Sequence, residues 1–230
     1  MTTRLESDSL GNKRIPASAY YGIQTSRAVE NFPISGLRLP TELIRAYGFI
    51  KKAAAAANAQ LGLLEARKAR AIMRACEELL RGRFDDQVVV DVYQAGAGTS
   101  FNMNINEVLA NRANELLGAR RGTYRFIHPN DHVNMAQSTN DTFPTALRLA
   151  CLMKRPALVD AMQALEEALR RKGRQFARVV KSGRTHLRDA VPVRLGGEFS
   201  AYAVAVAKAG ARIDQTARLL GELNLGGTAV

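Results

Sequence analysis

Apolar residues recur every three or four positions along most of the chain, the spacing that places them on one face of a helix. On this pattern we predict helices over residues 41–61, 69–80, 104–117, 142–170 and 195–220. Gly82 and Gly118 follow two of these segments and suit helix ends. Pro156 lies inside the fourth, and because proline removes a backbone donor, we expect that helix to kink or split there.

The segment from Leu195 to Leu220 predicts a helical bundle. Its apolar positions alternate in steps of four and three, a heptad pattern, and we expect Pro192 to lie in its first turn. The other faces carry alanine and glycine, which are too small and apolar for an ordinary solvent face. We therefore expect a second set of neighbouring helices, and other subunits could supply them. A single coiled-coil-like hairpin within a monomer is the simpler alternative.

The fold predicted from these patterns is all-α and has two parts. Residues 1–137 form a mostly helical N-terminal domain, which begins with an irregular arm at 1–40. Pro16, Pro33 and several glycines interrupt that arm, so it holds at most a short hairpin. Residues 138–230 form the beginning of a central domain, a bundle of long helices.

Charge and composition narrow the function classes. The net charge is +12, but the 33 lysines and arginines are interleaved with acids along the helices, and tryptophan is absent. Without a zinc-finger, RRM or KH pattern, this favours solvated helix faces over nucleic-acid binding. No apolar run reaches membrane-spanning length, and Met1 to Gly11 lacks the apolar core of a signal peptide. We expect a cytoplasmic protein, whose basic surface favours the approach of small dianions.

Metal and cofactor chemistry finds little support. Cys76 and Cys151 lie inside helical patterns and are interpreted as reduced thiols packed as small apolar residues. His128 and His132 are four residues apart, but Pro129 argues against a continuous helix between them. We predict neither a metal site nor a cofactor.

Short polar segments precede helical stretches at three places and give the best indication of function. They are Gly98-Thr99-Ser100, Ser138-Thr139-Asn140-Asp141 and Gly183-Arg184-Thr185-His186. The first turn of a helix has unpaired N–H groups and partial positive charge, so hydroxyl, amide and imidazole groups placed there form a receptor for carboxylate or phosphate. Three such ends that converge would make an anion pocket. For each hydroxyl taken alone, helix capping is the simpler role.

These segments and three others resemble the aspartase/fumarase superfamily over the whole chain. The others are Ala19 to Thr25, Arg27 to Phe32 and His128 to Asn134. Within the superfamily the chain is most similar to the aspartate ammonia-lyase branch. Class II fumarases typically have Gly-Thr-Gln and Ser-Ser-Asn-Asp where this chain has Gly98-Thr99-Ser100 and Ser138-Thr139-Asn140-Asp141.

The resemblance implies a lyase that reversibly eliminates ammonia from L-aspartate to give fumarate. It assigns binding of the β-carboxylate to Thr99, Ser138 and Thr139. It assigns binding of the amino group to Asn140 and His186, and binding of the α-carboxylate to Thr185. It also implies a second, non-catalytic anion site, formed by His128, Asn130 and Asp131.

The catalytic base of the superfamily is a serine on a Gly-Ser-Ser loop, and we expect that loop beyond residue 230. The chain is thus interpreted as an N-terminal fragment, inactive alone, of a homotetramer with shared active sites. Two alternatives stay open. One is a class II fumarate hydratase or another lyase of the same fold, and the other is a non-catalytic helical assembly piece.

Overall fold

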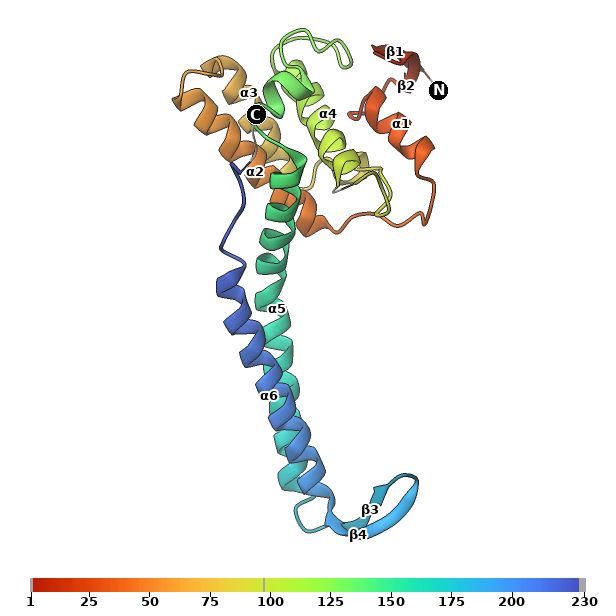
Figure 1. Ribbon diagram of the computed structural model, residues 1–230, viewed down its shortest axis with the longest axis vertical. Helices are drawn as coiled ribbons and strands as arrows, with labels where there is room; N and C mark the ends of the chain where they lie inside the picture. The colour runs from red at the N-terminus through yellow and green to blue at the C-terminus, as the bar shows by residue number, and fades with distance from the viewer. Residues whose placement is uncertain (1, 97, 228–230) are drawn as a thin grey trace. The chain divides into compact units, whose positions relative to one another are not determined.

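The structure is a computed structural model that describes residues 2–96 and 98–227. It contains two compact units, which are considered separately below (Figure 1). One comprises the described residues of Met1–Ala150 and Leu223–Val230, and the other comprises Cys151–Glu222. Both are mostly helical, as predicted, and each also contains a two-stranded antiparallel sheet.

The first unit contains short strands, a helical core and the beginning of a long helix. Its elements are β1 (Thr3–Asp8), β2 (Gly11–Pro16), α1 (Ile23–Asn31), α2 (Thr41–Gln60), α3 (Ala66–Leu80), η1 (Asp85–Gln87), α4 (Thr99–Leu116), η2 (Pro129–Val133) and the first residues of α5 (Thr139–Gln175). The second unit contains the rest of α5, followed by β3 (Val180–Thr185), β4 (Arg188–Arg194) and α6 (Leu195–Leu219).

The core of the first unit lies between α2, α3 and α4. Tyr47 of α2 and Phe101 of α4 are fully buried and meet edge to face with their ring centroids 4.8 Å apart. Ile72 and Leu79 of α3 complete this layer. Most of α4 is buried on every side, including its asparagines, so this helix forms the centre of the unit.

The N-terminal arm is more regular than its sequence predicts. The hairpin of β1 and β2 fits the expectation, but α1 does not, because its sequence has no capping residue. Glu107 of α4 supplies the cap instead: its carboxylate accepts hydrogen bonds from the amides of Gly22, Gln24 and Thr25 and from the Thr25 hydroxyl. A residue more than 80 positions away thus determines where this helix starts.

The predicted helices are present, with corrections at two prolines. We expected Pro156 to kink or split its helix, and the split is wrong, because α5 continues from Thr139 to Gln175 as one helix. Pro156 is exposed, so water can reach the carbonyl that it leaves without a donor. Pro192 was expected in the first turn of the last helix, yet it lies in β4, and α6 starts three residues later.

In the second unit, α5 and α6 form a helical hairpin whose connection is the β3–β4 sheet. Arg155 of α5 binds Asp214 of α6, and the rings of Phe176 and Phe199 lie 5.7 Å apart. Next to the β3–β4 sheet, the backbones of α5 and α6 approach closely. A Cβ atom at Gly196 would come within 2.4 Å of the Gly173 carbonyl oxygen. Glycine is therefore required at Gly196 for the two chain segments to meet.

Candidate functional site

The first polar segment lies at the N-terminus of α4. Gly98 precedes this helix with a φ of 80°, a left-handed conformation that suits glycine, and a Cβ atom there would overlap the ring of Phe143. Thr99, the first residue of the helix, is exposed. The amide of Phe101, in the first turn, has no partner within the helix and donates a hydrogen bond to Oε1 of Gln94 at 2.6 Å.

The second polar segment lies at the N-terminus of α5, as predicted. Ser138 caps the helix, because its Oγ accepts a hydrogen bond from the amide of Asn140 at 3.2 Å. The simpler capping role therefore applies to Ser138, although its own hydroxyl hydrogen stays free to donate. Thr139 is partly exposed and Asn140 is exposed.

The structure brings these two helix ends together. Asn102, one turn after Thr99 on α4, donates a hydrogen bond from Nδ2 to Oγ1 of Thr139 at 3.0 Å. The contact between Gly98 and Phe143 joins the same two elements. Hydroxyl groups of two helix N-termini, each with a positive dipole end, therefore share one region of the surface.

The third polar segment does not precede a helix, which corrects our expectation. Gly183 to Thr185 belong to β3, and His186 and Leu187 form the two-residue turn into β4. Both turn residues have positive φ, 45° and 63°, as a tight hairpin turn of matching twist requires. Thr185 and His186 are exposed in the second unit and so belong to a different compact unit from Thr99 and Thr139.

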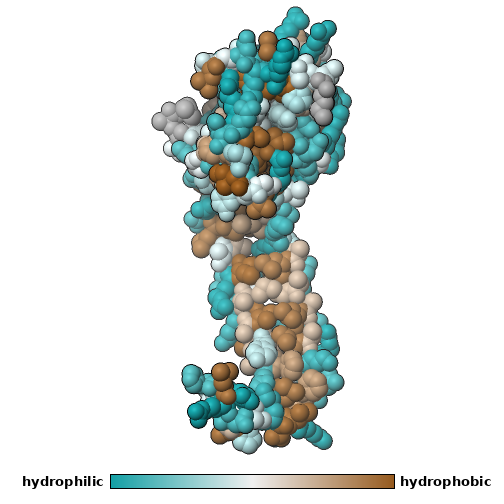
Figure 2. Space-filling model, turned by 90° about the vertical axis from the view of Figure 1, so that its right-hand side faces the viewer, coloured by the Kyte–Doolittle hydropathy of each residue, from teal (hydrophilic) through white to brown (hydrophobic). Residues whose placement is uncertain are grey.

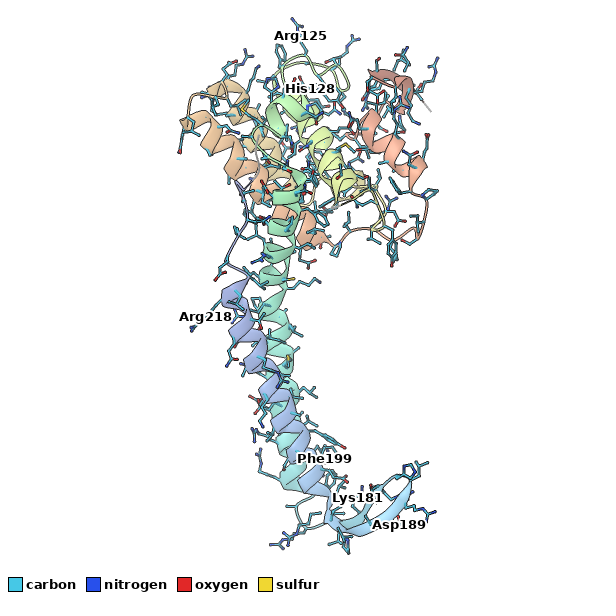
Figure 3. The ribbon with its side chains drawn as sticks, viewed as in Figure 1. Arg125, His128, Lys181, Asp189, Phe199 and Arg218 are labelled. Carbon is cyan, nitrogen blue, oxygen red and sulfur yellow. The ribbon has the colours of Figure 1, made fainter. Side chains whose placement is uncertain are left out.

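The residues of the predicted second anion site lie together at η2. The Nδ1 atom of His128, which is labelled in Figure 3, accepts a hydrogen bond from the Asp131 amide at 3.3 Å. Asn130, between these two residues in the sequence, is exposed. His128 and Asn130 line a cavity of about 240 Å³, and the carboxylates of Asp8 and Glu107 line it too. Of these, Asp8 is paired with an arginine, while burial raises the pKa of Glu107.

A buried polar cluster beside the two helix ends was missed from the sequence. Lys51 of α2 is fully buried, and its Nζ donates to Oδ1 of Asn134 at 2.8 Å. The same oxygen accepts from Asn102 at 3.1 Å and from Asn106 at 3.2 Å. Burial lowers the pKa of Lys51 to about 7, because the charged form loses its hydration.

One sequence signal could have revealed part of this cluster. The segment of α4 contains asparagine at positions 102, 104, 106, 111 and 114, although asparagine is a poor helix former. All five are buried, so each needs a hydrogen-bond partner within the protein. Repeated asparagines inside a helical segment thus indicate a polar network. The partner positions, such as Lys51, cannot be identified in that way.

Within the described ranges, no group of three or more histidine, cysteine, aspartate and glutamate side chains could hold a metal ion. A search of the same residues finds no helix with the length and apolar character needed to cross a membrane.

Comparison with known proteins places the chain in a family. A family model described as lyase matches residues 11–230. The chain is 51% identical over 227 residues to an aspartate ammonia-lyase of a Bacillus species and 53% identical over 231 residues to a class II fumarate hydratase of Halobacterium salinarum. Each match covers 99% of this chain and 48% of the relative, so the chain spans about half the length of these relatives.

A solved structure gives the same result for the fold. The crystal structure of a fumarate lyase:delta crystallin from Brucella melitensis, in native form, matches with a TM-score of 0.92 and 53% identity. That match covers 98% of this chain and 53% of the other. In sequence and in fold, the chain belongs to the lyase family of the aspartase/fumarase superfamily.

Proposed function

We propose that this chain supplies part of the substrate site of a lyase that converts L-aspartate to fumarate and ammonia. The observation that carries this proposal is the hydrogen bond from Asn102 to Thr139, which holds the N-termini of α4 and α5 side by side. Two helix ends with exposed or partly exposed hydroxyls form a receptor suited to a carboxylate. The relatives named aspartate ammonia-lyase support the choice of substrate.

The chemistry explains why such a receptor is needed. A base removes a proton from the β carbon, a double bond forms between the α and β carbons, and ammonia leaves with the electron pair of the C–N bond. Negative charge accumulates on the β-carboxylate while the proton is removed, so its stabilisation is the main catalytic task. We assign this task to Thr99, Ser138 and Thr139, which donate hydrogen bonds without neutralising the carboxylate in advance.

The remaining assignments follow the resemblance. Asn140 and His186 would receive the amino group, and Thr185 the α-carboxylate. Because His186 and Thr185 belong to the other compact unit, we propose that they act in an active site of the assembled protein, together with a base outside these 230 residues. We also retain a cytoplasmic location as part of this proposal.

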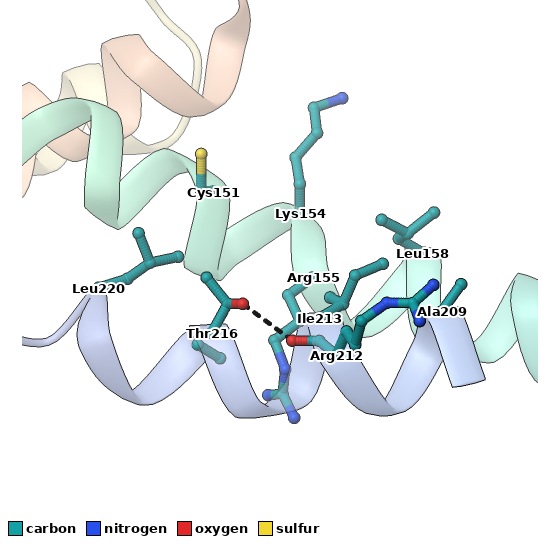
Figure 4. A pocket seen from close by; sticks show the side chains of 10 residues that line it. Cys151, Lys154, Arg155, Leu158, Ala209, Arg212, Ile213, Thr216 and Leu220 are labelled. Atoms are coloured by element: carbon teal, nitrogen blue, oxygen red, sulfur yellow. Dashed lines mark hydrogen bonds between the residues drawn. The ribbon is translucent and has the colours of Figure 1, made fainter. Parts of the chain in front are cut away.

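A homotetramer would provide that assembly. Apolar side chains run along the face of the second unit shown in Figure 2, and Leu158, Leu165 and Tyr202 are each about half exposed. A groove of about 530 Å³ between α5 and α6 is lined by Leu158, Ile213 and Leu220 (Figure 4). Cys151 also lines this groove and is exposed. We expected its thiol to be packed as a small apolar residue, and for Cys151 that expectation is wrong. Helices from other copies would cover this surface.

Light scattering tests the assembly. We expect the complete protein that contains this chain to be a tetramer at micromolar concentration, and the 230-residue chain alone to self-associate. An active monomer of the complete protein would refute both the bundle and the shared site.

Activity assays on the complete protein test the reaction. Fumarate formation is measured by absorbance with L-aspartate and L-malate side by side, in protein purified from a host without its own aspartase. Faster turnover of malate would move the assignment to class II fumarate hydratase, which the Halobacterium relative represents. Absence of turnover with both would favour the non-catalytic assembly piece. The 230-residue chain alone is expected to release no ammonia.

A single substitution tests the role of the α4 N-terminus. Thr99→Val removes one donor and should lower kcat/KM for aspartate by roughly 100-fold, the usual loss for an oxyanion donor. Thr123→Val is the matched control, because Thr123 is an exposed loop residue whose hydroxyl donates to the Arg120 carbonyl. Equal activities of the two variants would contradict the assignment of Thr99.

A further inference from the structure

A chain of side-chain hydrogen bonds runs from the buried interior to the first turn of α5. Lys51 donates to Oδ1 of Asn134 at 2.8 Å. Asn102 donates from Nδ2 to the same oxygen at 3.1 Å and to Oγ1 of Thr139 at 3.0 Å. A fully buried lysine is therefore connected, through two amides, to a hydroxyl at the proposed substrate site.

The orientation of the Asn134 amide is fixed from both sides. Its Nδ2 donates to the backbone carbonyl of Gln137 at 2.9 Å, and a carbonyl can only accept. Its Oδ1 accepts a hydrogen bond from Nζ of Lys51, and the protonated form of that amine can only donate. Turning the amide over would place donor against donor and acceptor against acceptor. Asn134 therefore presents its oxygen to Asn102.

The side-chain amides of Asn102 and Asn106 are oriented by the Asn134 oxygen, and this orientation has an energetic cost. Asn102 and Asn106 both turn their NH₂ groups toward Oδ1 of Asn134. Their own amide oxygens are left buried without a hydrogen-bond partner among the described residues. Unpartnered buried acceptors are unfavourable, and packing alone gives no reason to keep both amides in this orientation.

The orientation of the Asn102 amide also determines the hydrogen-bonding role of the Thr139 hydroxyl. Its Oγ1 accepts from Asn102, which is its side-chain partner within the described part of the chain, so the hydroxyl hydrogen points elsewhere. We propose that Asn134, held by Lys51, and Asn102 are positioning residues that make the Thr139 hydroxyl a donor toward bound ligand. A donor suits a carboxylate oxygen, which can only accept. This inference rests on the proposed function, because it takes a carboxylate as the ligand of Thr139.

Binding of a non-reacting dicarboxylate, succinate, to the complete protein provides the test. Calorimetry compares wild type, Asn102→Leu, Thr139→Val and the double variant. Asn102→Leu should weaken binding about tenfold in the wild-type background, the loss expected for a hydrogen bond to a charged group. In the Thr139→Val background it should have almost no effect, since the hydroxyl that it orients is gone.

Asn106→Leu is the matched control. Asn106 donates to the same oxygen of Asn134, whereas the hydrogen bond that Oγ1 of Thr139 accepts comes from Asn102. Its effect on succinate binding should therefore be the same in both backgrounds. If Asn102→Leu does not fold, as judged by circular dichroism, Asn134→Ser replaces it, with the same expectation of coupling to Thr139.

The outcomes separate the inference from the function beneath it. Coupling between positions 102 and 139 that exceeds the coupling between 106 and 139 supports the inference. If Asn102→Leu weakens succinate binding equally with and without the Thr139 hydroxyl, the inference is overturned. The proposed function is retained in that case, provided that wild type binds succinate. A wild-type protein that binds neither succinate nor aspartate overturns the proposed function, and the inference with it.

Discussion

The burial of Lys51 leads to a prediction about stability and pH. The folded protein surrounds this side chain completely, with Oδ1 of Asn134 as its hydrogen-bond partner, and lowers its pKa from 10.5 to about 7. A folded-state pKa below the unfolded value means that the unfolded chain binds the additional proton between these two values. Stability should therefore rise with pH from about 7 to 10.5, as the penalty for burying the charge is relieved.

The size of the effect follows from the two pKa values. The difference between 10.5 and about 7 corresponds to roughly 5 kcal/mol, which is the full penalty below pH 7. Replacing the side chain in Lys51→Met removes this penalty and also removes one hydrogen bond, which is worth about 1 kcal/mol or slightly more. From about pH 6 to about pH 9, wild type should therefore gain roughly 2.5 kcal/mol relative to Lys51→Met.

Urea unfolding followed by circular dichroism at several pH values measures this difference. Lys52→Met is the matched control, since it removes an adjacent lysine that is about 40% exposed and paired with Glu77. The stability difference between wild type and Lys51→Met should change with pH, and that between wild type and Lys52→Met should change much less. A constant difference for Lys51→Met would show that Lys51 keeps an ordinary pKa in the folded protein and would refute the reasoning.

Two glycine substitutions give further predictions. Gly98→Ala should destabilise the protein by more than about 2 kcal/mol, because positive φ and overlap with Phe143 both oppose a Cβ atom; in Gly118→Ala, where φ is positive but the space is open, only the conformational cost should appear in thermal unfolding. Gly196→Ala should cost about 1–3 kcal/mol, because the new Cβ meets the backbone of α5, whereas Gly197→Ala, with open space, should be neutral or slightly stabilising.

The parts of the fold that depend on nearby residues could be predicted from the sequence. Thr99 and Ser138 lie at helix starts because polar segments there are followed by strong helical periodicity. Capping by the Ser138 hydroxyl accounts for the second start, and Gly98, with its positive φ, precedes the first. His186 was placed wrongly, because His-Leu is an unusual pair for a tight turn and lacks the asparagine or glycine that marks most hairpins.

Features that depend on distant residues could not be predicted. Lys51 and Asn134 are 83 positions apart, and their contact exists only after α2 and η2 pack against each other. Likewise, the N-terminus of α1 has no capping side chain of its own, so a local reading of residues 1–40 describes it as irregular. The network that orients Thr139 is for the same reason visible only in three dimensions.

The capping of α1 by Glu107 has a consequence for synthesis of the chain on the ribosome. The arm forms only a small apolar cluster of its own, Ile15, Ala19 and Ile23. The amide of Gly22 donates to Glu107, which is synthesised 85 residues later, and the Tyr20 carbonyl accepts from Asn111. At about 5–20 residues per second, the nascent arm therefore stays unanchored for several seconds. The arm is thus synthesised before the residues of α4 that hold it in place, and during that interval it is open to chaperones and proteases.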